Sequence, residues 1–438
     1  MPHPSAHPAP VPAPEAVRLA AALAAATDAY ARRNPRSAEM AAAAARHLPG
    51  GSTRSSIWYA PFPLRMVRGE DCRLFDADGH EYVDFLGEFS AGIYGHSAAA
   101  VREAITGALA EGLSLSAHNR WEGRLASLIC ERFASIDLVR FTNSGTEANL
   151  LAIAAAQGAT GRRRVLVFEG GYHGSVLSFL PGGAGIRVPH DFVIGRYNDV
   201  EGGRALIGQH AADLAAILVE PMQGSAGCIP GSVEFLASLR QGADAAGAAL
   251  IFDEVQTSRL SSGGLQGRLG ITADLTTLGK YFGGGLAFGC FGGRRSIMER
   301  FDPRRPDGLA HAGTFNNNTL TMAAGAAALS TLLTPGALEE LNRRGDSLRA
   351  AMMTLFERLD APLGVTGLGS LMNIHPNVPA AAMGDARKLL FFALLEAGIY
   401  TAARGFIALS LPITDVHTAR LLGALERFVH DFGPAMRL

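Results

Sequence analysis

Hydrophobic and polar positions change their spacing several times along the middle of the chain. The expected elements there lie at residues 139–142 (strand), 147–158 (helix), 164–168 (strand), 215–219 (strand), 233–247 (helix) and 249–252 (strand). Strands that alternate with helices are typical of a mostly parallel sheet with helices on both faces. Such a sheet carries its sites at the carboxyl ends of the strands. The pattern therefore predicts an α/β fold whose functional residues follow the strands.

The two ends of the chain have other patterns. The expected elements there are a helix at 15–48, hairpin strands at 73–75 and 81–85, a helix at 98–113, strands at 369–375 and 407–411, and a last helix from residue 415. Pro49, Gly50 and Gly51 end the first helix. These elements predict a smaller α+β unit beside the large sheet.

The changes of pattern predict four parts of the chain. Residues 1–16 are a Pro/Ala-rich tail that cannot build a core and is expected to be disordered. Residues 17–87 are an N-terminal segment of helix and short strands that belongs to the small domain. Residues 88–330 form the large domain with the ligand site, and residues 331–438 form the C-terminal small domain.

Composition excludes several classes of function. Charged residues make up 18% of the chain and the formal net charge is −1, so we expect no nucleic-acid partner. No run of about 18 uncharged apolar residues occurs, and no basic region followed by an apolar one opens the chain, so we expect neither a membrane span nor a secretory signal. The four cysteines form no CxxC pair, which argues against a metal site. A cytoplasmic location is expected.

Lysine is rare in this chain, which contains only Lys280 and Lys388. Arginine stays protonated, whereas a lysine amine can lose its proton and attack a carbonyl. Lys280 follows an apolar strand and precedes three glycines, which let the backbone approach a bulky ligand. Partial burial there would lower the pKa of the amine. Lys280 is therefore the candidate nucleophile, and Lys388, in an amphipathic stretch, is expected at the surface.

A carboxylate ends another apolar strand at Asp253. If the ligand is a pyridine, an ionised Asp253 keeps the ring nitrogen protonated, and the ring then withdraws electrons from the atoms bound to it. A helix cap or a surface salt bridge is the alternative interpretation.

The segment at 141–156 leads from a strand through Ser144, Gly145 and Thr146 into a helix. The free backbone N–H groups of the helix start and the two hydroxyls suit an anion such as a phosphate. An ordinary helix cap with Glu147 in the first turn is the alternative.

Three more segments follow strands or precede a helix. Tyr172 and His173 lie in a Gly-rich loop, where an aromatic ring can stack on a flat ligand or pack within the loop. Glu220 closes an apolar strand. Thr314 and three asparagines precede a helix rich in small residues.

In their order and spacing, these segments resemble the class III (ω-amino acid) aminotransferases of the fold type I pyridoxal-phosphate (PLP) superfamily. The separation of Asp253 and Lys280, the Ser-Gly-Thr segment and the Tyr-His-Gly loop are jointly specific. The resemblance implies a large domain with a mostly parallel seven-stranded sheet, a smaller α+β domain, and PLP as cofactor. It also implies a homodimer with shared sites, and an amino donor and a 2-oxo acid as substrates.

The resemblance implies a role for each matching position. Lys280 resembles the lysine that links covalently to the cofactor, Asp253 the partner of the ring nitrogen, and Gln256 a neighbour of the ring's phenolic oxygen. The other implied cofactor-binding positions are Ser144, Gly145 and Thr146 (phosphate), Tyr172 and His173 (ring stacking and its loop) and Glu220 (orientation).

Thr314 resembles the residue that reaches the phosphate from the neighbouring subunit. The family often has a proline where Thr319 follows Asn318 here, so the local turn departs from the family pattern.

Within class III, segments such as 88–97 and 403–412 look most like the branch that holds aromatic β-amino acid (β-phenylalanine) aminotransferases and glutamate-1-semialdehyde aminomutases. In that branch Arg54 and Arg404 match carboxylate binders, and planar guanidinium groups suit a carboxylate. The aromatic candidates for a substrate pocket include Phe89 and Tyr94.

Two other interpretations stay open. An aminomutase uses the same cofactor but moves nitrogen within one molecule, so it needs no separate acceptor. A binding protein that kept the fold without catalysis would conflict with the joint presence of Lys280, Asp253 and the phosphate segment.

Overall fold

The computed structural model describes residues 14–181 and 186–437. Its helices are α1 (Pro14–Arg33), α2 (Pro35–Ala44), α3 (Ala99–Glu111), α4 (Arg120–Arg132), α5 (Gly145–Thr160), α6 (Val200–His210), α7 (Val233–Ala246), α8 (Gly264–Leu269), α9 (Arg295–Met298), α10 (Thr319–Thr331), α11 (Pro335–Arg358), α12 (Met383–Glu396) and α13 (Asp415–Met436). Of the tail expected at residues 1–16, residues 1–13 lie outside the described part of the chain, and α1 begins at Pro14.

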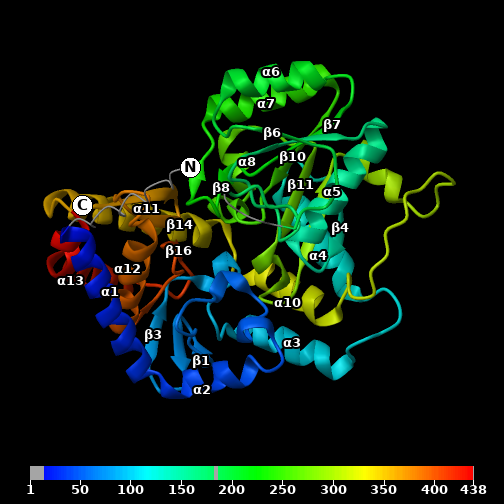
Figure 1. Ribbon diagram of the computed structural model, residues 1–438. Helices are drawn as coiled ribbons and strands as arrows, with labels where there is room; N and C mark the ends of the chain where they lie inside the picture. Colours follow the sequence, from blue (N-terminus) through cyan, green and yellow to red (C-terminus); the bar gives the residue numbers. More distant parts are fainter. Residues whose placement is uncertain (1–13, 182–185, 438) are drawn as a thin grey trace, which may run out of the picture.

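The strands of the large sheet are β4 (Leu138–Thr142), β5 (Arg164–Phe168), β6 (Phe192–Gly195), β7 (Leu214–Val219), β10 (Ala249–Asp253), β11 (Leu275–Gly279) and β12 (Gly289–Gly293). They form one sheet in the order β4-β12-β11-β10-β7-β5-β6 (Figure 1). Strand β12 runs antiparallel to β11 and β4, and the remaining pairs are parallel. The mostly parallel seven-stranded sheet expected from the sequence is confirmed.

Alternate residues of the central strands face two different cores. In β7, Ala216 and Leu218 pack with the apolar residues of α5, whereas Ile217 and Val219 pack with those of α6 and α7. This alternation is the period-2 geometry of a strand. Because both faces are covered, the strand consists of uninterrupted apolar residues. Because β10, β11, β7, β5 and β6 run parallel, their carboxyl ends lie at one edge of the sheet.

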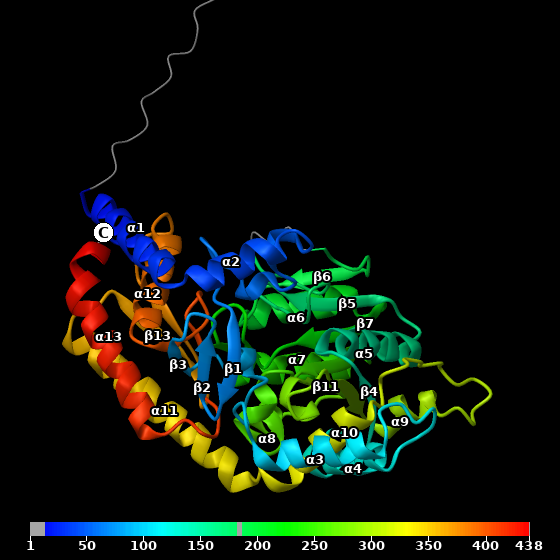
Figure 2. The ribbon, with the colours of Figure 1, turned by 90° about the horizontal axis from the view of Figure 1, so that it is seen from below.

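The smaller sheets combine the two ends of the chain. Their strands are β1 (Met66–Glu70), β2 (Arg73–Asp76), β3 (Glu81–Asp84) and β15 (Ile399–Tyr400) in one sheet, β13 (Leu363–Leu368), β14 (Leu371–Pro376) and β16 (Phe406–Ala408) in a second, and β8 (Met222–Gln223) with β9 (Ile229–Pro230) in a third. Strand β15 pairs in parallel with β3, so the N-terminal hairpin and the C-terminal part share a sheet. Figures 1 and 2 show the first two of these sheets with α11, α12 and α13 on one side of the molecule and the large sheet on the other.

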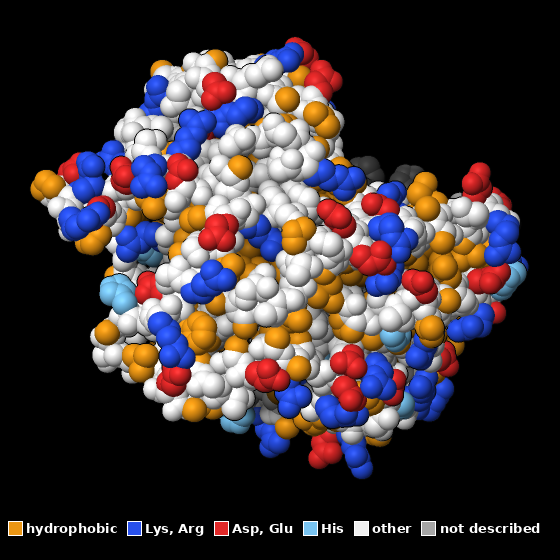
Figure 3. Space-filling model, turned by 180° about the vertical axis from the view of Figure 1, so that it is seen from behind, with side chains coloured by type: hydrophobic (Ala, Val, Ile, Leu, Met, Phe, Trp, Pro, Cys, Tyr) orange, Lys and Arg blue, Asp and Glu red, His pale blue; other side chains and the backbone are white. Residues whose placement is uncertain are grey.

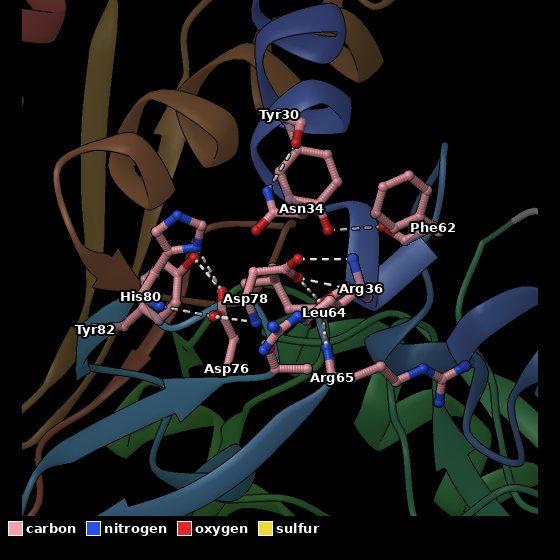
Figure 4. A network of polar contacts seen from close by, with 12 residues as sticks. Tyr30, Asn34, Arg36, Phe62, Leu64, Arg65, Asp76, Asp78, His80 and Tyr82 are labelled. Atoms are coloured by element: carbon pink, nitrogen blue, oxygen red, sulfur yellow. Dashed lines mark hydrogen bonds and ion pairs between the residues drawn. The ribbon is translucent and has the colours of Figure 1, made fainter. Parts of the chain in front are cut away.

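The single helix expected at residues 15–48 is wrong, because the chain breaks it at Asn34. A residue before proline avoids the helical region, and Asn34 has φ −125° in front of Pro35. Helix α2 then starts anew, and its free N–H groups at Arg36 and Ser37 donate to the carboxylate of Asp78 at 2.7 and 3.0 Å. Figure 4 shows Asp78 reaching α2 from the hairpin turn. The break therefore joins the helical segment to the hairpin.

The surface mixes both signs of charge. On the face seen in Figure 3, acidic and basic side chains are interspersed. Within residues 14–181 and 186–437, no single helix is long and apolar enough to cross a membrane; α10 and α11, bent by 80°, meet the length and composition test only as a pair.

Candidate active site

A cavity of about 550 Å³ opens at the carboxyl ends of the central strands. It lies where β4, β7, β10 and β11 end, the position that parallel sheets use for ligands. The sequence-predicted residues that the structure brings together in its lining are Arg54, Ser144, Gly145, Thr146, Tyr172, His173, Glu220, Asp253, Gln256 and Lys280. Ser144 and Lys280, which are 136 positions apart in the sequence, thus line one cavity because both follow strands of one sheet.

Lys280 is the first residue after β11 and lies in the short turn η5 (Lys280–Gly283). Its φ is +57°, a left-handed conformation that is uncommon for a residue with a side chain. The amine Nζ donates a hydrogen bond to the carbonyl oxygen of Phe89 at 2.8 Å. Burial lowers the pKa of Lys280 to about 8, although the nearby charges of Asp253 and Glu88 act in the opposite direction. More of the Lys280 amine is therefore unprotonated near neutral pH than in an ordinary exposed lysine.

Asp253 ends β10 and is buried. Its Oδ2 accepts a hydrogen bond from Asn149 Nδ2 at 2.9 Å and lies 2.8 Å from His173 Nδ1. Its Oδ1 accepts from the Val255 N–H at 3.0 Å. Hydrogen bonds to the charged form of a carboxylate favour that form. The arrangement fixes the carboxylate in one orientation toward the cavity.

Asn149 is a residue of the site that the sequence analysis missed. Its Nδ2 bonds Asp253 and its Oδ1 accepts from Thr277 Oγ1 at 2.8 Å, while Thr277 lies on the neighbouring strand β11. The available signal is that Asn149 is a polar residue in an otherwise apolar, Ala-rich helix. Such a residue is buried only if its amide finds partners, and here the partner is the carboxylate of the site.

Glu220 follows β7 directly and is buried. Burial, and then the charge of Asp253, raise the pKa of Glu220 well above its usual range. Its Oε2 accepts a hydrogen bond from the Tyr172 N–H at 3.3 Å. Glu220 therefore holds the backbone of the loop that carries Tyr172.

The start of α5 offers free N–H groups to the cavity. Ser144 is the N-cap, and its hydroxyl accepts from the Glu147 N–H at 3.2 Å. The Glu147 carboxylate accepts a hydrogen bond from the Asn143 N–H at 2.9 Å, so its negative charge lies beside the backbone of Asn143. The N–H groups of Gly145 and Thr146 lie in the first turn, where a helix has no internal acceptors. This geometry suits an anion.

The Tyr-His-Gly loop packs directly on this helix start. Gly174 has φ +125°, and a side chain there would come within 2.2 Å of Thr146 Oγ1. Across the cavity, the Oε1 atom of Gln256 is buried without a hydrogen-bond partner among the described residues. This atom packs against Gly224, where a side chain would come within 1.7 Å of it.

The guanidinium groups of both predicted arginines lie close to the ring of Phe89. Arg54 lines the cavity and forms an ion pair with Glu88. The guanidinium of Arg404 lies over the rings of Phe89 and Phe406, 5.5 and 5.2 Å from their centres. Its Nη1 donates to the Ser225 carbonyl at 2.7 Å. Arg404 thus contacts the ring of Phe89 but does not line the cavity in this conformation.

Four predicted site residues are not among those that line the cavity: Phe89, Tyr94, Thr314 and Arg404. Tyr94 is buried in the main core, where its ring lies edge-on to that of Tyr281 with 6.4 Å between the ring centres. Phe89 is partly buried and stacks on Phe406, with 6.0 Å between the ring centres. Thr314 is exposed on the loop before α10 and lines a separate hollow of about 580 Å³ with Phe315 and residues 113–119. Within one chain, Thr314 is not part of the Lys280 cavity.

The protein-family model for class-III aminotransferases matches residues 55–184 and 197–429. The chain is 51% identical over 417 residues to the β-phenylalanine transaminase of Variovorax paradoxus, covering 93% of this chain and 96% of the relative. It is 36% identical to glutamate-1-semialdehyde 2,1-aminomutase 2 of Brevibacillus brevis, covering 89% and 97%.

Solved structures agree with these sequence relations. The crystal structure of the β-phenylalanine aminotransferase from Variovorax paradoxus has a TM-score of 0.92 and 51% identity, covering 95% of this chain and 98% of that one. A transaminase structure with PLP bound has a TM-score of 0.87 and 33% identity, covering 92% and 99%.

The chain belongs to the class-III aminotransferase family. The resemblance seen in the sequence is thereby confirmed, and with it a PLP-dependent transaminase on the fold type I scaffold.

Proposed function

We propose that this chain moves the amino group of an aromatic β-amino acid, such as β-phenylalanine, to a 2-oxo acid such as 2-oxoglutarate or pyruvate. The observation that carries the proposal is the low-pKa amine of Lys280 in one cavity with Asp253, the open start of α5 and Arg54. The 51% identity to a β-phenylalanine transaminase supports the substrate class.

The lining of the cavity fits PLP group by group. The free N–H groups of Gly145 and Thr146 and the Ser144 hydroxyl would bind the phosphate. Asp253 would keep the ring nitrogen protonated, and the side chain of Gln256 would lie near the ring's phenolic oxygen. The ring of Tyr172, which is 39% exposed, is available to stack.

Bound PLP supplies an electron-withdrawing ring that makes a proton on the amine-bearing carbon of the substrate removable. The amine of Lys280 takes that proton and delivers it to the cofactor side of the site. Its lowered pKa suits this task, because half of the amine is free at a pH of about 8. Asp253, fixed by Asn149 and His173, holds its negative charge in place throughout.

Arg54 and Arg404 would anchor carboxylates. A β-amino acid carries its carboxylate one carbon further from the amine than an α-amino acid does, so the anchor must be set away from Lys280. Arg54 lines the cavity in such a place. Arg404, half-enclosed by Phe89 and Phe406, would meet the second carboxylate of 2-oxoglutarate and move aside for an aromatic ring.

The complete site requires a homodimer in this proposal. Thr314 does not line the Lys280 cavity of its own chain but a separate exposed hollow. We infer that it reaches the phosphate of the neighbouring subunit, as the family pattern implies. The dimer would work in the cytoplasm, without a nucleic-acid or membrane partner.

Product formation tests this function. The purified protein with PLP is given racemic β-phenylalanine and 2-oxoglutarate, and glutamate is measured. Formation of glutamate only in the presence of both substrates supports transfer between molecules. Turnover of an amino substrate without any acceptor would identify an aminomutase instead.

A further inference from the structure

The short turn η3 (Gly87–Ser90) has an unusual backbone. Its residues Gly87, Glu88, Phe89 and Ser90 have φ values of 52°, 49°, 51° and 77°. Three residues with side chains thus lie consecutively in the left-handed region, which they normally avoid. Such conformations persist only where the surroundings fix them, and they are concentrated at functional sites.

Contacts on both sides fix this turn. The carboxylate of Asp84 accepts hydrogen bonds from the Leu86 and Gly87 N–H groups at 2.9 and 3.0 Å. The Phe89 carbonyl accepts from the amine of Lys280 at 2.8 Å. The fully buried guanidinium of Arg259 donates to the Ser90 carbonyl at 3.4 Å. The side chain of Glu88 therefore projects from a rigid base beside the active-site lysine.

The carboxylate of Glu88 contacts the guanidinium of Arg54. Arg54 Nη1 donates to Glu88 Oε1, and both side chains are partly exposed, at 44% and 57%. Arg54 also lines the cavity, with its guanidinium 5.8 Å from the centre of the Phe89 ring. The positively charged guanidinium of Arg54, which faces the cavity, is therefore already paired with a carboxylate of its own chain.

The second arginine of the site differs in this respect. Among the described residues, no carboxylate forms an ion pair with Arg404, which bonds the Ser225 carbonyl instead. The difference follows from the turn, since Glu88 is the residue that the left-handed backbone directs toward Arg54. An exposed ion pair is worth little free energy, so a carboxylate ligand can replace Glu88 on Arg54.

We propose that Glu88 is an internal competitor for the substrate carboxylate: it binds Arg54 in the free enzyme and is displaced when the substrate binds. This proposal rests on the proposed function, because it takes Arg54 as a carboxylate anchor. Glu88 then sets the affinity of the site for carboxylate ligands, and it keeps the charge of Arg54 compensated between turnovers.

The test measures binding of 3-phenylpropanoate, which has the carboxylate but no amine, to the PLP-loaded enzyme by calorimetry. Glu88→Gln removes the competing charge at nearly constant shape, so we expect about two- to fivefold tighter binding than in the unchanged protein. The neutral analogue 3-phenylpropanamide is expected to bind equally well to both proteins. Glu88→Asn, whose side chain tolerates the left-handed region, serves as a second variant.

Glu70→Gln is the matched control, because Glu70 forms an exposed ion pair with Arg68 at 2.9 Å on β1, outside the cavity lining. Its affinity for 3-phenylpropanoate should equal that of the unchanged protein. Equal or weaker binding by both Glu88 variants would overturn the proposal and identify Glu88 as a support for Arg54. Because no amino transfer is involved, a failure of the β-phenylalanine assay leaves this result readable.

Discussion

At the scale of single residues, the chemistry depends on how burial and neighbouring charges tune a few ionisable groups. Lys280 loses part of its hydration, which lowers the pKa of its amine to about 8. Glu220 lines the same cavity as Asp253. Burial raises the pKa of its carboxyl, whereas burial lowers the pKa of the Lys280 amine. The same cavity thus disfavours the charged forms of both the Lys280 amine and the Glu220 carboxyl.

The lowered pKa of Lys280 can be measured directly, because the chain has only one other lysine. Burial disfavours the ammonium form, so labelling of Lys280 by acetic anhydride in the cofactor-free protein should rise with pH around a midpoint of about 8. Mass spectrometry separates it from Lys388, which is exposed on α12 and serves as the reference amine. A midpoint for Lys280 at or above that of Lys388 would contradict the account.

Arg404 gives a second prediction at this scale. Arg404→Ala should lower kcat/KM for 2-oxoglutarate by about 10- to 100-fold, because a hydrogen bond to a charged group contributes about 1.5–3 kcal/mol. Pyruvate lacks the second carboxylate, so its kcat/KM should fall less. Arg343→Ala, at an exposed ion pair with Glu340 on α11, is the control. Unchanged activity with 2-oxoglutarate would remove Arg404 from the substrate site.

At the scale of elements, strands that follow the apolar pattern were predictable and glycine-rich ones were not. The residues Gly289–Gly293 look like a loop in sequence but form β12, which pairs with β4 and β11 in the large sheet. Glycine is required at these positions because neighbouring backbone leaves no room for a side chain. A side chain at Gly289 would come within 2.1 Å of the Ser144 carbonyl oxygen, and a side chain at Gly293 within 2.1 Å of the Asp274 carbonyl oxygen. Such a close approach of two segments that are distant in the chain leaves no signal in the local sequence.

The same limit applies to the site. Lys280, Asp253 and Ser144 were predictable because each directly follows an apolar strand or starts a helix. Asn149 was not, since its role depends on Asp253 and Thr277 from other strands. The turn at Glu88 and the burial of Tyr94 likewise depend on contacts between distant segments.

Helix α11 allows a matched test of close packing. A side chain at Gly345 would come within 2.0 Å of the Gly369 carbonyl, whereas one at Gly336 in the same helix would meet nothing within 4 Å. Gly345→Ala should therefore destabilise the fold by about 1–3 kcal/mol, seen as a lower melting temperature. Gly336→Ala should be neutral or slightly stabilising, because alanine favours a helix. Equal melting temperatures for the two variants would show that the loop at Gly369 yields.

At the scale of the whole molecule, the account requires two chains for each complete site. Lys280→Ala and Thr314→Glu should each be nearly inactive, the first without its amine and the second through a negative charge beside the phosphate. If Thr314 serves the neighbouring subunit, unfolding and refolding an equal mixture should restore about a quarter of the normal activity, since half of the dimers are hybrids with one intact site each.

The arrangement of Thr314 decides how this mixture behaves. If Thr314 acted within its own chain, every site of a hybrid dimer would carry one defect. No recovery of activity in the mixture would then contradict the shared site. Recovery is expected, because Thr314 lines a hollow separate from the Lys280 cavity of its own chain.

The central claim is that this chain is a transaminase of aromatic β-amino acids, and the absorbance spectrum of the PLP-loaded protein tests it most directly. Racemic β-phenylalanine is added without any 2-oxo acid, and 2-oxoglutarate is added afterwards. The account predicts that the absorbance of the aldehyde form of the cofactor gives way to that of its amino form, stays there, and returns only with 2-oxoglutarate. A spectrum that β-phenylalanine leaves unchanged would contradict the assigned substrate.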